Sequence, residues 1–349
     1  MINYVVARTV LLLMFCFFYV PSVDAASTST GGGINKIYRI FHFVLRNVDF
    51  DSAKKMLVQA HSSGFNTIQL TLSDGVRLKH APWKAQRDAW TKSQLIEWSN
   101  LANSLGMEVI PQLALLTHQQ KFFQNNYPEL MYSKGIYDPR NEQTYVKVFA
   151  VLQEVIDIFH PKAIHIGHDE VAGWILPATT FYKKDRRIGL GKGEEVFPAE
   201  LFLDDVLKVH DFLKKRHVET WMWGDMLISD EEFPHMMARD LHGEIAPGYG
   251  GILRHKLPKD IVICDWHYGD EQRDFPSLKV FHDEGFRVVG STFIKEKTIT
   301  NFSHYAKRHG AIGMMATTWY FVQRKEWDKV NRIIQFSGET FLRDFPDEK

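Results

Sequence analysis

The sequence predicts a single (β/α)8 TIM barrel of the α/β class, because eight short apolar runs alternate with helical segments from residue 36 onward. Eight parallel strands with helical crossovers are enough to close a barrel. An open doubly wound sheet is the alternative, but the glycines nearest the first strand, Gly31–Gly33, precede it, and no phosphate-binding loop follows it. The predicted strands are Ile37–Leu45, Asn66–Leu72, Glu108–Leu113, Ala163–Gly167, Thr220–Gly224, Ile261–Trp266, Arg287–Thr292 and Gly313–Thr318.

Segments with helical spacing separate these strands, and several begin after a plausible capping residue. Two long connections, 175–198 and 229–258, contain glycine, proline and charged residues. Long connections in a barrel usually follow the strands, so we expect these two to build the mouth of the active site. The predicted helices are Ser52–Ser62, Lys92–Leu105, Glu142–Phe159, Ala199–Arg216 and Trp327–Leu342, and the predicted caps are Asp51, Thr91, Asn141 and Pro198.

Residues 1–26 have the layout of a secretory signal peptide. Arg8 precedes a short apolar run, Val10–Val20, which Pro21 ends, and the small residue Ala25 precedes the expected cleavage point. The run is short for a transmembrane helix, which needs about 20 residues. We therefore expect an exported protein, periplasmic or secreted, with an uncleaved membrane anchor as the alternative.

The composition is that of an ordinary globular protein. Lys and Arg number 42 and Asp and Glu number 42, and this balance gives no reason to expect nucleic acid or an anionic membrane as partner. A flexible lead-in is expected at 27–35 and one catalytic domain at 36–349. Cleavage of the signal peptide would leave Cys264 as the remaining cysteine, so no intramolecular disulfide is expected.

The most informative segment is the end of the predicted fourth strand. Because side chains alternate faces along a strand, Ile164 and Ile166 should point toward covering helices. His165, Gly167 and Asp169 should point into the barrel. These polar residues therefore approach the end of the strand that carries catalysis in barrel enzymes.

Two adjacent carboxylates, Asp169 and Glu170, follow this strand. Strict alternation would send them to opposite sides, so the chain must leave strand geometry near His168 if both are to share one pocket. Paired carboxylates suit glycosidic cleavage, in which one protonates the leaving oxygen and another negative group stabilises positive charge at the sugar carbon. The alternative is an exposed acidic pair at a helix start, where it favours the helix dipole.

Three tryptophans, Trp223, Trp266 and Trp319, lie at the carboxyl ends of predicted strands. The C–H face of a sugar stacks on an aromatic ring, mainly through burial of apolar area. Each tryptophan alone would be read as a core residue, but three at the same end of a barrel favour a sugar pocket.

The segment His165-Ile-Gly-His-Asp-Glu170 resembles glycoside hydrolase family 20, the β-N-acetylhexosaminidases, whose fourth strand ends in His-x-Gly-Gly-Asp-Glu. The resemblance covers residues 37 to about 322. The chain is similar to the hexosaminidase D-like branch, whose members consist of the barrel and little else. We therefore expect no α/β domain before the barrel. Further matches are Arg39, similar to a sugar-binding arginine; Pro111 and His118, at the spacing of the third-strand pattern; Trp223 and Asp225 in the fifth-strand pattern; Tyr268 and Asp270, as Tyr-x-Asp; and Trp319, similar to the tryptophan that floors the sugar pocket.

The resemblance implies an exo-acting β-N-acetylhexosaminidase that releases terminal GlcNAc or GalNAc from a glycan by a retaining, substrate-assisted mechanism. Glu170 would act as acid and then as base, and the 2-acetamido oxygen of the substrate would be the nucleophile. Asp169 would orient the acetamido N–H, and Tyr268 would hold the acetamido oxygen, with Tyr320 as the runner-up. His118, Trp223, Asp225, Trp266, Asp270, Trp319 and Arg39 would contact substrate, and no cofactor or metal is expected.

The chain departs from the family pattern at several positions. His168 replaces a glycine, Gln112 replaces a glutamate, and Phe321 stands where many members have a sugar-binding glutamate. Two alternatives follow from these departures and from the histidines. One is a non-catalytic sugar-binding barrel. The other is a metal-dependent hydrolase, although His165 and His168 should face opposite sides of a regular strand and could not then chelate one ion.

Overall fold

The computed structural model describes residues 36–119, 122–133, 135–171, 197–229, 232–233 and 249–347. The chain divides into two units, Met1–Asn35 and Lys36–Lys349, and the fold below is that of the second unit. The predicted signal peptide and lead-in, residues 175–196 of the first long connection, and residues 230–231 and 234–248 of the second lie outside the described residues. Within the described part of the chain, no helix has the length and apolar character needed to cross a membrane.

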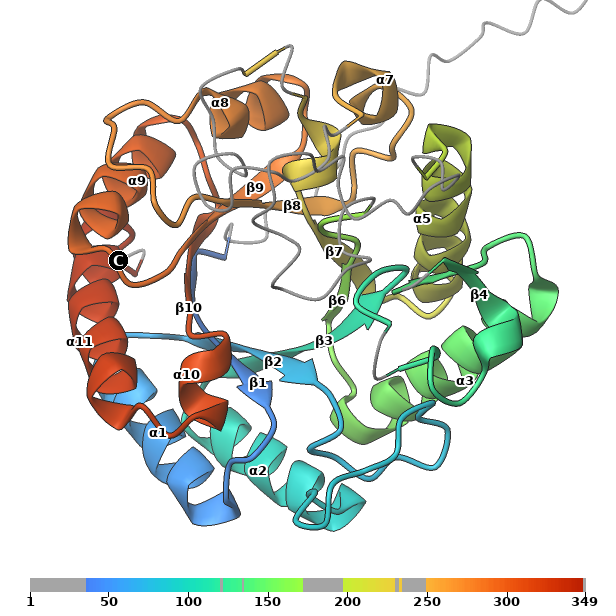
Figure 1. Ribbon diagram of the computed structural model, residues 1–349. Helices are drawn as coiled ribbons and strands as arrows, with labels where there is room; N and C mark the ends of the chain where they lie inside the picture. Colours follow the sequence, from blue (N-terminus) through green and yellow to red (C-terminus); the bar gives the residue numbers. More distant parts are fainter. Residues whose placement is uncertain are drawn as a thin grey trace, which may run out of the picture. The chain divides into compact units, whose positions relative to one another are not determined.

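Eight parallel strands close into a barrel in the order β1-β10-β9-β8-β7-β6-β3-β2 (Figure 1), which confirms the predicted fold class. Each predicted strand is present, and its ends differ from the prediction by no more than two residues. The strands are β1 Tyr38–Leu45, β2 Thr67–Leu72, β3 Glu108–Leu115, β6 Ala163–Gly167, β7 Glu219–Trp223, β8 Val262–Trp266, β9 Arg287–Thr292 and β10 Gly313–Thr317. A small antiparallel pair that was not predicted, β4 Met131–Ser133 and β5 Ile136–Tyr137, follows β3.

The helices lie outside the ring of strands (Figure 1). The cap predicted at Thr91 is a full capping box with Gln94, and Asn141 caps the third helix through its side chain. The first helix begins earlier than predicted, because Asp49 rather than Asp51 accepts the capping hydrogen bond. The helices are α1 Phe50–Ser62, α2 Lys92–Ser104, α3 Glu142–Phe159, α5 Ala199–Lys214, α7 Gly251–Arg254, α8 Pro276–Asp283, α9 Glu296–Arg308, α10 Tyr320–Gln323 and α11 Trp327–Asp344.

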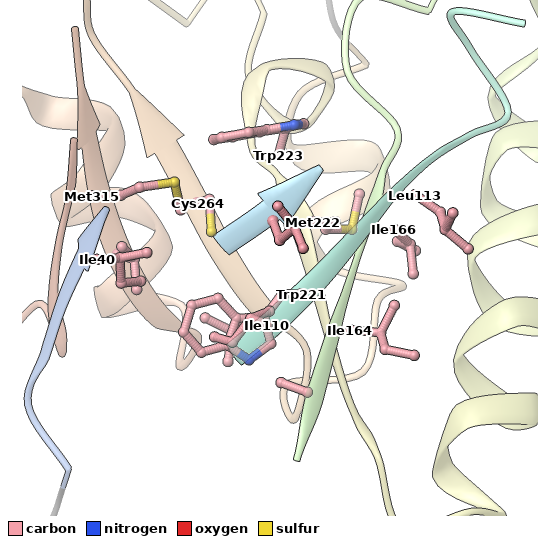
Figure 2. Close-up of a cluster of buried hydrophobic side chains, with 14 of the residues drawn as sticks. Ile40, Ile110, Leu113, Ile164, Ile166, Trp221, Met222, Trp223, Cys264 and Met315 are labelled. Atoms are coloured by element: carbon pink, nitrogen blue, oxygen red, sulfur yellow. The ribbon is translucent and has the colours of Figure 1, made fainter. Parts of the chain in front are cut away.

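Side chains alternate between the helix-facing side and the inside of the barrel, and Ile164 and Ile166 face the helices as predicted. Ile164 and Ile166 of β6 lie on its helix-facing side, whereas Trp221 and Trp223 of β7 lie inside the barrel (Figure 2). Trp221 packs edge-on against Tyr38 of β1, with ring centroids 5.0 Å apart. These two rings fill the inside of the barrel at its amino end, here called the amino rim; the opposite end, where the strands finish, is called the carboxyl rim.

Candidate active site

The chain leaves strand geometry directly after β6, as the sequence requires for a shared pocket. Gly167, His168 and Glu170 have φ values of 77°, 65° and 50°, all in the left-handed region. A glycine is needed at 167, since a Cβ there would lie 3.1 Å from the Cα of Ala114 on β3. The turn brings Asp169 and Glu170 to the same side of the chain.

His118, which follows β3, joins the two carboxylates. Its Nε2 lies 3.1 Å from Asp169 Oδ2 and 3.7 Å from Glu170 Oε2. One nitrogen or oxygen from each of the three side chains lies within 4.8 Å of the other two. The backbone of the turn is also held, because the Thr117 hydroxyl donates to Asp169 O at 2.8 Å and Glu170 N donates to Asp225 Oδ2 at 2.8 Å.

The surroundings of the two carboxylates shift their pKa values in opposite directions. Burial, opposed by His118 and reinforced by Asp169 and Asp225, raises the pKa of Glu170 to about 8. Burial also opposes ionisation of Asp169, but the charge and hydrogen bond of His118 outweigh it and lower the pKa of Asp169. Burial disfavours the charged form of His118, yet Asp169 and Glu170 prevail and raise the pKa of His118 to about 9. Glu170 is therefore suited to carry a proton, and Asp169 a negative charge.

Asp225 stands behind Glu170, at the carboxyl end of β7. Burial and the charge of Asp169 raise its pKa, while hydrogen bonds from Glu170 N–H and from the Trp266 side chain oppose that rise. Asp225 thus links the catalytic turn to an aromatic residue at the end of β8.

Aromatic rings surround this end of the barrel. Trp319, which follows β10, lies with its ring centroid 5.7 Å from Trp223, 6.3 Å from Tyr268 and 4.8 Å from His42. Trp266 lies 4.9 Å from Tyr268. The pKa of the buried Tyr268 is raised, by burial first and then by the charges of Asp169 and Glu170, so its hydroxyl belongs to the same electrostatic environment.

Tyr320, the runner-up for the role of Tyr268, is placed differently. It is exposed, it packs against Phe293 and Phe321, and the Arg324 guanidinium lies 4.0 Å from its ring centroid. Tyr268 is therefore the better-placed tyrosine. Phe321, where many family members have a sugar-binding glutamate, is buried and stacks on Phe293 at 5.0 Å.

The expectation that Arg39 binds sugar is wrong, because the structure places it at the amino rim. It is the second residue of β1, about 20 Å along the strand from its carboxyl end. Its guanidinium donates to Gly64 O at 2.6 Å, Phe345 O at 2.8 Å and Asp347 Oδ1 at 2.8 Å. Arg39 therefore ties the end of α11 and the turn after α1 to the bottom of the barrel.

Replacing this arginine should affect stability and not ligand binding. Arg39→Ala removes the charged donor from the buried Phe345 carbonyl and from the part-buried Gly64 carbonyl, and hydrogen bonds to charged groups contribute roughly 1.5–3 kcal/mol each. We expect thermal unfolding at a clearly lower temperature, with the Michaelis constant unchanged at a temperature where the variant is folded. A raised Michaelis constant with an unchanged melting temperature would restore the sugar-binding role.

Asp270 contacts residues other than the two carboxylates. Its side chain is buried, accepts a hydrogen bond from Gln272 N at 3.0 Å, and lies 3.9 Å from His267 Nδ1. His267 in turn contacts Ser277 on α8 and Phe302 on α9. The structure therefore joins Asp270 to the helical layer, whereas Tyr268, two residues earlier, faces the aromatic cluster.

A polar layer inside the barrel was not predicted from the sequence. Gln112 accepts hydrogen bonds from Gln69 Nε2 and from the Thr71 hydroxyl, both at 2.7 Å, and His42 Nε2 lies 2.8 Å from Thr71 Oγ1. Burial lowers the pKa of His42 to about 3 and that of His165 to about 3, so both rings are neutral. The alternation of polar residues on three neighbouring strands could have revealed this layer.

The structure does not bring His165 and His168 together at one metal site. His165 lies inside the barrel against Trp223, whereas His168 points outward to Asp205 on α5, with Nε2 2.7 Å from Oδ2. Among the described residues the group that could hold a cation is His118, Asp169 and Glu170, which are also among the ligand types that the sequence offers for the metal alternative. The outward direction of His168 confirms the alternation argument, and Asp205 is a contact that the sequence did not reveal.

A closed barrel with a buried, oppositely tuned carboxylate pair at its carboxyl rim is the architecture of the barrel glycoside hydrolases. The family model described as glycosyl hydrolase family 20, catalytic domain, matches residues 65–294. The chain belongs to this family, which confirms the family resemblance seen in the sequence.

Comparisons with individual proteins agree with this assignment. Beta-hexosaminidase A of Caenorhabditis elegans is 23% identical over 209 residues, which cover 54% of this chain and 37% of that protein. The β-N-acetylhexosaminidase from Bacteroides fragilis NCTC 9343 has the same fold, with a TM-score of 0.61 at 17% identity over 88% of this chain and 66% of that chain. Dispersin B gives a TM-score of 0.57 at 16% identity over 89% of this chain and 100% of that chain. The chain therefore spans well under half the length of the curated relative, and its fold covers all of Dispersin B.

Proposed function

We propose that the protein is an exo-acting β-N-acetylhexosaminidase that removes terminal N-acetylhexosamine by a retaining, substrate-assisted mechanism. The observation that carries the proposal is the pair of adjacent carboxylates with opposite pKa shifts, Glu170 raised and Asp169 lowered. A proton donor and a fixed negative charge in one buried pocket are what cleavage of a glycosidic bond requires. The names of the relatives support the choice of substrate class.

In the first step Glu170 gives its proton to the glycosidic oxygen as the bond from that oxygen to the sugar carbon breaks. The acetamido oxygen of the substrate forms the new bond to this carbon, which gives an oxazolinium ion. Asp169 accepts a hydrogen bond from the acetamido N–H and stabilises the positive charge. The Tyr268 hydroxyl donates a hydrogen bond to the acetamido oxygen. Trp319 supplies the apolar surface for the sugar ring, and the buried Trp223 packs behind it with ring centroids 5.7 Å apart.

In the second step the roles of the acid are reversed. Glu170, now a carboxylate, removes a proton from water as the water oxygen attacks the same sugar carbon. The bond to the acetamido oxygen breaks, and Glu170 is again protonated. Two displacements at one carbon give overall retention of configuration. His118 keeps Asp169 ionised throughout, because its Nε2 stays within hydrogen-bonding distance of that carboxylate.

A panel of nitrophenyl glycosides tests the proposal. The β-N-acetylglucosaminide and the β-N-acetylgalactosaminide should release nitrophenol, and the β-glucoside and β-galactoside, which lack the acetamido nucleophile, should not. Equal rates on substrates with and without this group would exclude substrate assistance. Binding of N-acetylglucosamine without turnover of any member of the panel would identify a non-catalytic sugar-binding barrel.

A metal-dependent hydrolase is the second candidate, because His118, Asp169 and Glu170 present ligand atoms within 4.8 Å of one another. Assays in EDTA separate the two mechanisms. The substrate-assisted mechanism predicts full activity after removal of divalent cations, and loss of activity that zinc restores would establish the metal mechanism instead.

The pH dependence of kcat/KM should show an alkaline limb near the pKa of Glu170, about 8. The acid form of Glu170 is the active form, so activity is present below this pKa and is lost as the pH rises through it. Asp169 must be ionised, and its lowered pKa keeps it so at pH values where an ordinary aspartate begins to protonate. Initial rates at low substrate concentration across pH 4 to 10 measure both limbs, and a rate that keeps rising above pH 9 would contradict the assignment of Glu170 as acid.

We further propose that the chain is exported and that it belongs to the hexosaminidase D-like branch. Residues 1–26 support export by their basic residue, apolar run and small residues before the expected cleavage point. N-terminal sequencing of protein recovered from the compartment outside the cytoplasmic membrane would test this, and a mature chain that still begins at Met1 would contradict cleavage.

A further inference from the structure

We propose that His168, acting through Asp205, is a positioning residue that fixes the turn on which Asp169 and Glu170 lie. The inference rests on the proposed function, since it concerns how the same two carboxylates are held. His168 does not face the pocket, so its effect on the reaction would be indirect.

The catalytic turn needs support from outside itself. His168 and Glu170 have φ values of 65° and 50°, a region that is unfavourable for residues with a side chain. Such conformations persist only where the surroundings over-determine them. Contacts to the rest of the fold must therefore hold this segment in place.

The His168 ring makes two such contacts. Its Nε2 lies 2.7 Å from Asp205 Oδ2 on α5, and its Nδ1 lies 3.1 Å from the carbonyl oxygen of Ile166. A carboxylate and a carbonyl oxygen are both acceptors, so both ring nitrogens are placed to donate. Both the His168 and the Asp205 side chains are fully buried.

The carboxylate of Asp205 is itself fixed. The Tyr137 hydroxyl donates to Oδ2 at 2.9 Å and the Tyr145 hydroxyl donates to Oδ1 at 2.7 Å. The ring of Phe202, one turn before Asp205 on α5, packs edge-on against His168 at 5.6 Å. We call His168, Asp205, Tyr137 and Tyr145 the outer clamp. It joins the turn to α5, to α3 and to β5, so three elements hold one histidine.

Further restraints on the turn act from the pocket side. The Thr117 hydroxyl binds Asp169 O, and Asp225 binds Glu170 N. Removal of the outer clamp would take away the support that α5 gives to this turn through His168. A displacement of about 1 Å in catalytic groups can cost about 10²-fold in rate. We therefore expect the clamp to affect kcat more than substrate binding.

A purely structural role for the clamp must be distinguished from a positioning role. His210 offers a matched control, because it is a buried histidine like His168. It lies on α5 and contacts a strand. Its Nδ1 lies 2.9 Å from Thr220 Oγ1 at the amino end of β7, away from the carboxylates. His210→Gln should loosen the contact between α5 and the barrel without touching the catalytic turn.

Three full-length variants test the inference: His168→Gly, which tolerates the left-handed backbone, Asp205→Asn, which keeps the shape of the side chain, and the His210→Gln control. Melting temperatures and steady-state parameters are measured where all three are folded. We expect kcat of His168→Gly to fall by about 10- to 100-fold with a KM within about threefold of wild type. Asp205→Asn should lose less, and His210→Gln should keep kcat within about twofold. An unchanged kcat in His168→Gly, or an equal loss in His210→Gln, overturns the proposal.

A crystal structure of His168→Gly makes the test independent of activity, and Asp205→Asn serves if His168→Gly does not fold. We expect a shifted turn in which the Glu170 N to Asp225 Oδ2 distance, 2.8 Å in the wild type, exceeds hydrogen-bonding range. An unmoved turn overturns the positioning role. An inactive wild-type protein would instead refute the proposed function, and the crystal structure would still decide on the clamp.

Discussion

Glu170→Gln is expected to lower kcat by about 10³-fold, the largest effect of any substitution considered, since general acid–base catalysis typically contributes 10²- to 10⁴-fold. The amide has nearly the shape of the acid, but it can neither protonate the leaving oxygen nor accept a proton from water. Because the side chain is buried beside His118, Asp169 and Asp225, no bulk water can take over its proton transfers easily. Steady-state rates on the aryl β-N-acetylglucosaminide measure the loss.

The loss should depend on the leaving group. Nitrophenolate leaves readily without a proton, so formation of the oxazolinium ion should suffer less with this substrate than with a disaccharide. Glu339→Gln, the same change at an exposed position of α11, is the matched control and should retain the wild-type rate. Wild-type turnover of the disaccharide by Glu170→Gln would remove Glu170 from the mechanism.

Asp169→Asn is expected to lower kcat by about 10²-fold or more and to shift the pH dependence. An amide cannot offset the positive charge of the oxazolinium ion, and preorganised charges of this kind contribute about 10²- to 10³-fold. The charge of Asp169 also raises the pKa of Glu170 and of His118. Its removal should lower both, so the alkaline limb of kcat/KM should move to lower pH.

The shift of this limb separates an electrostatic role for Asp169 from a merely steric one. Asp328→Asn on the exposed face of α11 is the control, and its pH dependence should match that of the wild type. An Asp169→Asn variant with a reduced rate but an unmoved alkaline limb would contradict the electrostatic coupling of Asp169 to Glu170.

Local pattern was sufficient to predict the barrel and the direction of side chains near its fourth strand. A strand has a period of two residues, so the sequence around His168 already implied an outward ring and a break in strand geometry, and both are present. The residue that pairs with the His168 ring could not be predicted from the sequence. Asp205 lies 37 residues later on a helix, and its approach depends on how α5 packs against β6.

The errors have physical causes as well. Arg39 was assigned to the sugar pocket because it lies on the first strand, but its position at the start of that strand puts it at the amino rim. Order along the chain does not distinguish the two ends of a barrel. Asp51 is the cap predicted for the first helix, whereas Asp49 accepts the capping bond in the structure; both side chains can accept such a bond, and the choice depends on backbone angles that the sequence does not encode locally.

The position of Arg39 has a consequence for how the chain folds. Strand β1 pairs with β2, which is the next strand in the chain, and with β10, which is the last strand of the barrel. The Phe345 carbonyl that binds Arg39 lies 306 residues after it in the chain. During synthesis the barrel therefore cannot close, and a charged side chain destined for burial stays in water, until nearly the whole domain has left the ribosome. Such late closure makes folding a post-translational event with high contact order, which slows it.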